Sequence, residues 1–129
     1  MTIKSFAAGA LAALFAILAS QAMAAGDPAK GRKVFNKCRA CHTIKAGKHR
    51  TGPSLHRVVG RKAGTARGFK KYKGLKNADW TWTEAELDAY LTDPKKYLRA
   101  KNRKRGTMVL KLKKAPDRAN VIAYIKSID

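Results

Sequence analysis

The chain has 129 residues, of which 29 are Lys or Arg and 8 are Asp or Glu, so its formal net charge is +21. This length allows one domain and excludes a multidomain enzyme. An apolar share of 45% excludes an intrinsically disordered chain, because enough residues are available to form a core. Two cysteines are too few for a scaffold held together by disulfides.

Residues 1–24 have the pattern of a secretory signal peptide. Lys4 gives a positive start, residues 6–19 form an apolar run, and Ala22-Met23-Ala24 provides a cleavage site. The alternative is a membrane anchor, but the 14 residues of the run fall short of the roughly 20 that a bilayer requires. We therefore expect cleavage and export to the periplasm, which leaves residues 25–129 as one domain with a formal charge of +20.

Two helices are expected first along this domain. Asp27-Pro28 is an N-cap followed by proline at the first helical position, which predicts a helix to about Lys37 with Val34 and Phe35 buried. A T-x-x-E capping box at 83–86 predicts a second helix that ends before Pro94. The apolar face of this second helix carries Leu87, Tyr90 and Leu91.

Two further helices complete an all-α prediction. Asp93-Pro94 repeats the cap pattern for a short helix through Tyr97 and Leu98. The last helix follows Pro116, with apolar residues at helical spacing, namely Val121, Ile122, Ile125 and Ile128. No segment alternates as a strand would, and residues 41–81 read as a long loop. A loop of this length in so small a domain is explained if it wraps a large buried cofactor.

The motif C-R-A-C-H at residues 38–42 is the attachment pattern of c-type haem. Cys38 and Cys41 are spaced to add to the two vinyl groups of one porphyrin edge, and His42 then directs its imidazole at the iron. Three alternatives remain: a thioredoxin-like dithiol, which lacks the usual βαβ pattern here, a zinc site completed by His49 and His56, and a disulfide between the two cysteines. The motif combined with export favours one covalently attached haem c.

Met108 is the candidate for the second axial position on the iron. It is the single methionine of residues 25–129, and it lies in a stretch, 95–114, where ten of twenty residues are Lys or Arg and none is acidic. A thioether is a soft ligand that favours ferrous iron. The competing readings are ordinary core packing of Met108, or ligation by Lys111, another lysine of this stretch, His49 or His56. Two axial protein ligands leave no open position, which favours electron transfer over oxygen or peroxide chemistry.

Several segments together resemble one family. H-R-T-G-P-S-L-H-R-V-V-G-R at 49–61, Y-L-T-D-P-K-K-Y at 90–97 and N-V-I-A-Y-I-K at 120–126 are similar to segments of class I cytochrome c, the family of mitochondrial cytochrome c and its periplasmic bacterial relatives. Gly31 and Phe35 fall where that family packs its first helix across its last. The resemblance covers nearly all of residues 25–129, and it implies a small all-α fold of helices and loops around one haem.

The resemblance also implies a set of haem-pocket residues. The carbonyl of Pro53 accepts a hydrogen bond from the second nitrogen of the His42 ligand. Arg61 and Trp82 match positions that contact a haem propionate, and Tyr90 matches a tyrosine close to the methionine ligand. Three features depart from the family pattern: about five extra residues and no proline between Tyr97 and Met108, Leu110 in place of an aromatic residue, and Tyr72 one position away from the usual tyrosine.

The positive charge predicts acidic partners. Residues 61–76 hold seven basic residues and no acidic one, like the stretch at 95–114, and in the family such segments lie around the exposed haem edge. A positive ring there would steer the protein onto acidic redox proteins, such as a quinol-oxidising cytochrome complex, a terminal oxidase, a photosynthetic reaction centre or a periplasmic dehydrogenase. Nucleic-acid binding is not expected, because no recognition motif is present. Weak contact with anionic lipid headgroups is a secondary expectation.

We therefore predict a soluble, monomeric, periplasmic monohaem cytochrome c that carries single electrons between larger redox complexes and is not an enzyme. The alternative function keeps the haem but has a labile sixth ligand, so that the iron binds peroxide or small gaseous ligands.

Overall fold

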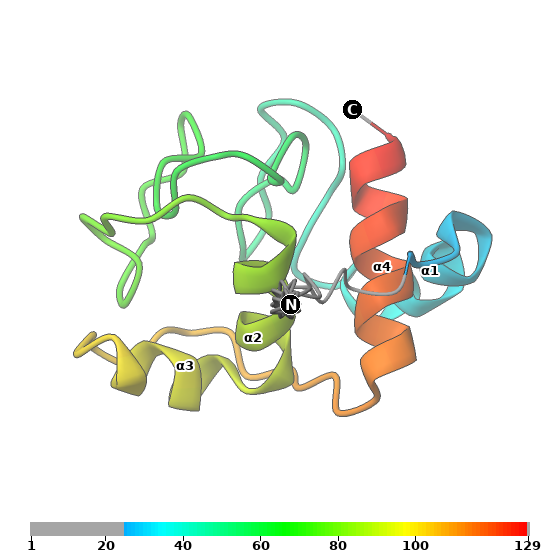
Figure 1. The fold of residues 1–129 in the computed structure, drawn as a ribbon. Coiled ribbons are helices and arrows are strands. Elements are labelled where there is room, and N and C mark those ends of the chain that lie inside the picture. The colour runs from blue at the N-terminus through cyan, green and yellow to red at the C-terminus, as the bar shows by residue number, and fades with distance from the viewer. Residues whose placement is uncertain (1–24, 129) are drawn as a thin grey trace, which may run out of the picture.

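The computed structural model describes residues 25–128, so the expected signal peptide at 1–24 lies outside the described residues, as does Asp129. Within this range the elements are α1 (Pro28–Val34), the 3₁₀-helix η1 (Phe35–Lys37), α2 (Glu84–Thr92), α3 (Pro94–Ala100) and α4 (Ala115–Ser127) (Figure 1). The all-α prediction is confirmed, since β pairing in residues 25–128 is limited to an isolated bridge between Lys62 and Thr81.

Aspartate side chains begin α1 and α3, as the two Asp-Pro pairs predict. Asp27 Oδ1 accepts a hydrogen bond from the N–H of Ala29 at 2.8 Å. Asp93 Oδ1 accepts one from the N–H of Lys96 at 3.0 Å. Each side chain satisfies an N–H group that has no partner inside its own helix, so both caps stabilise the first turn.

The capping box of α2 is only half formed. Thr83 Oγ1 accepts a hydrogen bond from the N–H of Glu86 at 3.1 Å, which is the expected half. The Glu86 carboxylate does not return a bond to Thr83 and instead accepts from the Tyr97 hydroxyl and Lys101. A tertiary contact with α3 and the residue after it has therefore replaced the local one.

The first and last helices pack across each other (Figure 1). A Cβ on Gly31 would lie 1.8 Å from the carbonyl oxygen of Asn120, so only glycine permits this approach of the two backbones. The Asn120 side chain also accepts a hydrogen bond from the N–H of Asp27 at 2.8 Å. Phe35 meets the ring of Tyr124 with ring centres 5.4 Å apart. These contacts place the Cys38–His42 turn directly after a fixed helix.

The last helix supplies much of the core. Val121, Ile122 and Ile125 are buried, as the helical spacing predicts. The helix begins earlier than expected, at Ala115 and so before Pro116, and Ile128 is a half-buried residue at its C-terminal cap.

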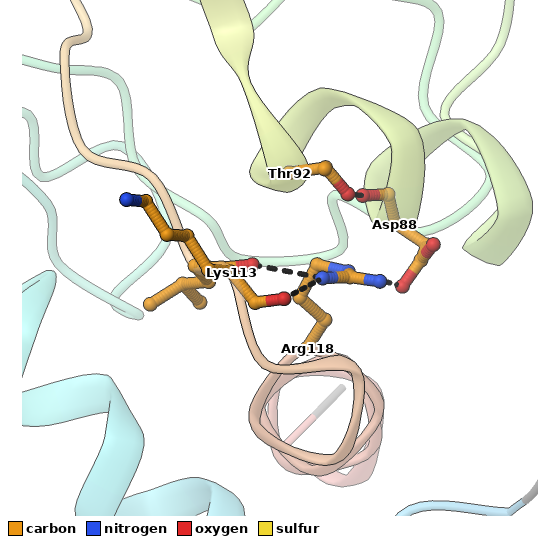
Figure 2. A network of polar contacts seen from close by, with 5 residues as sticks. Asp88, Thr92, Lys113 and Arg118 are labelled. Carbon is orange, nitrogen blue, oxygen red and sulfur yellow. Dashed lines mark hydrogen bonds and ion pairs between the residues drawn. The ribbon is translucent and has the colours of Figure 1, made fainter.

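Arg118 joins α4 to α2 and to the segment between α3 and α4. Its Nε donates to Asp88 Oδ1 at 2.7 Å, and its Nη1 donates to the carbonyl oxygens of Leu112 and Lys113, both at 2.9 Å (Figure 2). The hydroxyl of Thr92 donates to the Asp88 carbonyl on the same helix. The guanidinium therefore fixes the chain a few residues after Met108.

Residues 41–81 form the long loop that the sequence predicts. Main-chain hydrogen bonds tie its middle to residues 80–82, just before α2. They join Gly60 N–H to the Trp82 carbonyl, Trp82 N–H to the Arg61 carbonyl, and Ala63 N–H to the Trp80 carbonyl, each at 2.8 Å. In Figure 1 this loop, coloured cyan to green, arches from the first helix over the molecule, and its green end approaches the segment after α3, where Arg103 donates to the Gly74 carbonyl. Across residues 25–128, no helix is both long and apolar enough to cross a membrane.

Candidate haem-binding site

The C-R-A-C-H motif forms a single turn after η1. The N–H groups of Cys41 and His42 donate to the Cys38 carbonyl at 3.1 and 2.9 Å. Cys38 is buried, with 7% of its surface exposed, whereas Cys41 is exposed, and both are free thiols. Burial raises the pKa of the Cys38 thiol to about 11, so this sulfur is protonated at neutral pH. The turn brings two unpaired thiols and an imidazole onto one short piece of backbone.

The His42 ring is held by its Nδ1 atom. This nitrogen lies 2.7 Å from the Pro53 carbonyl oxygen, which only accepts hydrogen bonds, so Nδ1 carries the proton and Nε2 keeps a free lone pair. Burial lowers the pKa of His42 and favours the neutral ring, although the bond to Pro53 partly opposes this effect. A Cβ on Gly52 would lie 2.3 Å from His42 Cε1, so the backbone itself supports the ring. The imidazole is thus prepared as a metal ligand through Nε2.

Arg61 lies near this imidazole and binds the loop that carries Pro53. Its Nη1 donates to the carbonyl oxygens of Ser54 and His56, both at 3.1 Å, and its Nη2 donates to Ser54 at 3.0 Å. Its positive charge is a further cause of the lowered pKa of His42. The structure therefore brings His42, Pro53 and Arg61 together, and the His42–Pro53 hydrogen bond is the one that the resemblance implies.

Trp82 and Tyr90 belong to a cluster of aromatic rings. Their ring centres are 5.0 Å apart, and Trp82 also stacks on Tyr97 at 6.0 Å. The rings of Trp80 and Trp82 are perpendicular, with their centres 6.1 Å apart. Burial raises the pKa of Tyr90 to about 12, which keeps its hydroxyl protonated. The Trp82–Arg61 main-chain bond connects this cluster to the His42 side of the pocket.

Met108 lies on the segment between α3 and α4. It is half-buried and packs against the core, while its neighbour Val109 is 70% exposed. Met108 also lines a surface hollow of about 210 Å³ together with Pro94, Lys95 and Lys111. Its thioether is therefore at the edge of the core and next to a surface hollow rather than enclosed in the core.

Three alternatives from the sequence lose support. Both ring nitrogens of His49 are used, because Nε2 donates to the Arg67 carbonyl at 2.8 Å and Nδ1 accepts from the Ser54 N–H at 2.9 Å. Residues 25–128 contain no cluster of three or more His, Cys, Asp or Glu side chains that would hold a zinc ion. Lys111 Nζ is paired with Asp93 Oδ2 at 2.8 Å and is not directed to a metal.

The residues present fit haem c. A covalent haem requires two free thiols, a neutral imidazole with an available nitrogen, and a second soft or nitrogen ligand on another segment. Cys38, Cys41 and His42 meet the first two requirements on one turn, and Met108 is placed on a separate segment that α2 and α4 fix. These ligand residues therefore support the interpretation that the long loop at 41–81 wraps a cofactor.

Comparison with known proteins identifies the family. Residues 28–129 match the family model of cytochrome c. The chain belongs to the class I c-type cytochromes and is therefore a monohaem electron-transfer protein with one covalently attached haem c.

Both relatives and solved structures support this membership. The chain is 44% identical to cytochrome c-550 of Paracoccus denitrificans over 78% of this chain and 73% of the relative. It is 40% identical to cytochrome c2 of Cereibacter sphaeroides over 95% of this chain and 96% of the relative. The structure of cytochrome c2 from Rhodospirillum centenum superposes with a TM-score of 0.73 at 38% identity, covering 80% of this chain and 98% of that one.

Sequence reasoning missed part of the aromatic cluster. Trp80, Tyr97 and Lys101 were given no role, although all three contact one another. One sequence feature could have indicated this cluster: Trp80 and Trp82 are two positions apart. In an extended segment, such as the one around the bridge residue Thr81, this spacing places both side chains on the same face.

Proposed function

We propose that Cys38 and Cys41 attach the haem and that His42 and Met108 are its axial iron ligands. The observation that carries this assignment is the hydrogen bond of His42 Nδ1 to Pro53, which leaves Nε2 available beside two free thiols. When bound, the haem supplies an iron that takes up or releases one electron as it alternates between ferric and ferrous states. Filling both axial positions from the chain excludes substrate from the iron, so the protein transfers electrons without catalysing a reaction of its own.

The surrounding residues have supporting roles in this proposal. Pro53 fixes the tautomer and the orientation of His42. Arg61 and Trp82 contact a haem propionate, and Tyr90 lies close to the methionine ligand. The hydroxyl of Tyr90 stays protonated at neutral pH, so it adds no negative charge beside the iron.

The location and partners follow from the sequence and from the charge. Residues 1–24 act as a cleaved signal peptide, and the mature domain of residues 25–129 works as a monomer in the periplasm. Its formal charge of +20 favours acidic redox proteins as electron donors and acceptors. The candidates are a quinol-oxidising cytochrome complex, a terminal oxidase, a photosynthetic reaction centre and a periplasmic dehydrogenase.

The optical spectrum of the ferric holoprotein tests the axial ligands. Methionine sulfur on ferric iron gives a weak far-red charge-transfer band, which we expect at neutral pH. The band should disappear in Met108→Ala and persist in Val109→Ala, a matched change at the exposed neighbouring residue. Covalent haem without this band in the unaltered protein would contradict the assignment of Met108, and the alternative function with a labile sixth ligand would replace it.

A further inference from the structure

Lys101 lies in a cage that sequence analysis did not identify. Its Nζ is 4.8 Å from the ring centre of Trp80 and 5.0 Å from that of Tyr97. The same Nζ is 3.3 Å from Glu86 Oε2, and the Glu86 carboxylate also accepts a hydrogen bond from the Tyr97 hydroxyl. An ammonium group is attracted to the negative face of an aromatic ring, and the carboxylate balances its charge. The two rings and the carboxylate therefore form a specific site for this lysine.

Trp80 contributes the face of its ring rather than its N–H group. Its Nε1 is buried and has no hydrogen-bond partner within the described residues. A buried donor without an acceptor lowers the stability of the fold, so the contacts of the Trp80 ring must offset the cost of burying this N–H group. Those contacts are with Tyr97, with Trp82 and with two cations, Lys101 and Arg103.

Arg103 extends the cage into a clasp on a second segment. Its Nε donates to the Gly74 carbonyl at 3.1 Å, and its Nη2 donates to the Lys76 carbonyl. A Cβ on Gly74 would lie 2.3 Å from the carbonyl oxygen of Lys104, so the two backbones touch here. The Arg103 N–H also donates to the Leu98 carbonyl at 2.9 Å, which turns the chain sharply after α3.

These contacts oppose a strong repulsion. Residues 99–105 contain five cations and no acid, so this part of the chain repels itself. Lys101 and Arg103 are held at the surface of the core by the contacts described above, whereas Arg99, Lys104 and Arg105 are exposed. The cage and clasp thus fix a segment that its own charge would otherwise push outward.

We propose that the cage around Lys101 and the clasp of Arg103 keep Met108 on the iron, an inference that rests on the assignment of Met108 as an axial ligand. Met108 follows Arg103 by five residues, and the chain beyond it is fixed by the Leu112 N–H bond to the Leu91 carbonyl at 2.8 Å. Met108 is therefore presented by a span that is fastened at both ends. Loosening the Arg103 end increases the number of conformations in which the sulfur is away from the iron.

An added ligand measures how often Met108 leaves the iron. Imidazole competes for the same position, and its apparent affinity is proportional to the fraction of molecules in which that position is open. We expect Lys101→Gln and Trp80→Leu each to tighten imidazole binding to the ferric holoprotein at neutral pH by about five- to tenfold. Loss of the far-red band during the titration reports the replacement of methionine directly.

Two variants separate this effect from a general change in charge or fold. Lys30→Gln removes the same charge from an exposed position on α1 and should leave the affinity for imidazole unchanged. Lys101→Arg keeps a cation over the rings and should bring the affinity back toward that of the unaltered protein.

The outcomes distinguish the two proposals. A far-red band in the unaltered protein, combined with equal imidazole affinities in Lys101→Gln, Trp80→Leu and Lys30→Gln, would overturn the role of the cage while leaving Met108 as the ligand. Absence of the band from the unaltered protein would overturn the ligand assignment itself, and the inference about the cage with it.

Discussion

His42 owes its position to main-chain atoms. The Pro53 carbonyl orients Nδ1, and the missing side chain of Gly52 leaves room for the ring. Main-chain contacts of this kind change little when surface residues change, because they depend on the path of the loop. The position of His42 is therefore built into the loop, whereas the segments on either side of Met108 are fixed by the side chains of Lys101, Arg103 and Arg118.

Asp93 should make the stability of the protein depend on pH. A hydrogen bond from Lys111, followed by the bond from the Lys96 N–H, lowers the pKa of Asp93 in the folded state. A lowered folded-state pKa adds stability that is fully present above the unfolded value of about 3.9 and is lost as pH falls through the folded pKa. We expect Asp93→Asn to lower the urea midpoint at pH 6, and the difference to vanish in strong acid.

Urea unfolding of the holoprotein from pH 6 to pH 2 measures this dependence. Asp79→Asn is the matched control, because Asp79 is exposed and caps no helix, and it should show little difference at any pH. A deficit in Asp93→Asn that stays constant down to pH 2 would show that its carboxylate charge is not the source.

The sequence predicted the site residues that have local or family patterns and missed those that depend on distant pairing. Cys38, Cys41 and His42 lie in one contiguous motif, so five residues suffice to recognise them. The ion pair of Lys111 with Asp93 and the position of Lys101 over Trp80 join residues that are far apart along the chain. Composition and periodicity do not identify such pairs, because they do not distinguish one lysine of the basic stretch from another.

At the scale of elements, helix starts were easier to predict than connections. Asp27 and Asp93 predict where their helices begin, because a capping side chain bonds to an N–H group no more than three residues away. The path of residues 41–81 depends on single main-chain bonds to Trp80 and Trp82, which leave no periodic pattern in the sequence. The capping box of α2 is half formed for a similar reason: the Glu86 carboxylate accepts a hydrogen bond from Tyr97 on α3, a contact that no local sequence pattern predicts.

Arg118 tests how α4 is joined to α2. Only 11% of its side chain is exposed, and its guanidinium donates hydrogen bonds to one carboxylate and two carbonyl oxygens. We expect Arg118→Met to lower the free energy of unfolding by about 2 kcal/mol, because Asp88 and the two carbonyls lose their donor while the aliphatic packing is kept. Urea denaturation followed by circular dichroism gives this value.

Arg99→Met provides the comparison for Arg118→Met. Arg99 is exposed on α3, so the same chemical change should alter stability by less than about 0.5 kcal/mol. Equal losses in the two variants would mean that general charge, rather than the bonds in Figure 2, explains the effect of Arg118.

At the scale of the whole molecule, the net charge should control the rate of electron transfer. We expect the ferrous protein to react with anionic ferricyanide about tenfold more slowly at high than at low salt, because ions screen the attraction. A cationic oxidant such as tris(phenanthroline)cobalt(III) should react faster as salt is added, because the same ions screen a repulsion. Stopped-flow absorbance measures both rates, and the same salt dependence for the two oxidants would contradict electrostatic steering.

The crossing of α1 and α4 also joins the two ends of the domain during folding. The Asp27–Asn120 hydrogen bond joins residues 93 positions apart, and the close approach at Gly31 requires the backbone of α4. A chain that ends before residue 115 therefore lacks the partner of its first helix. We expect the turn that carries Cys38 and His42 to become fixed only after the last helix has packed, because closing so long a loop has a high entropic cost.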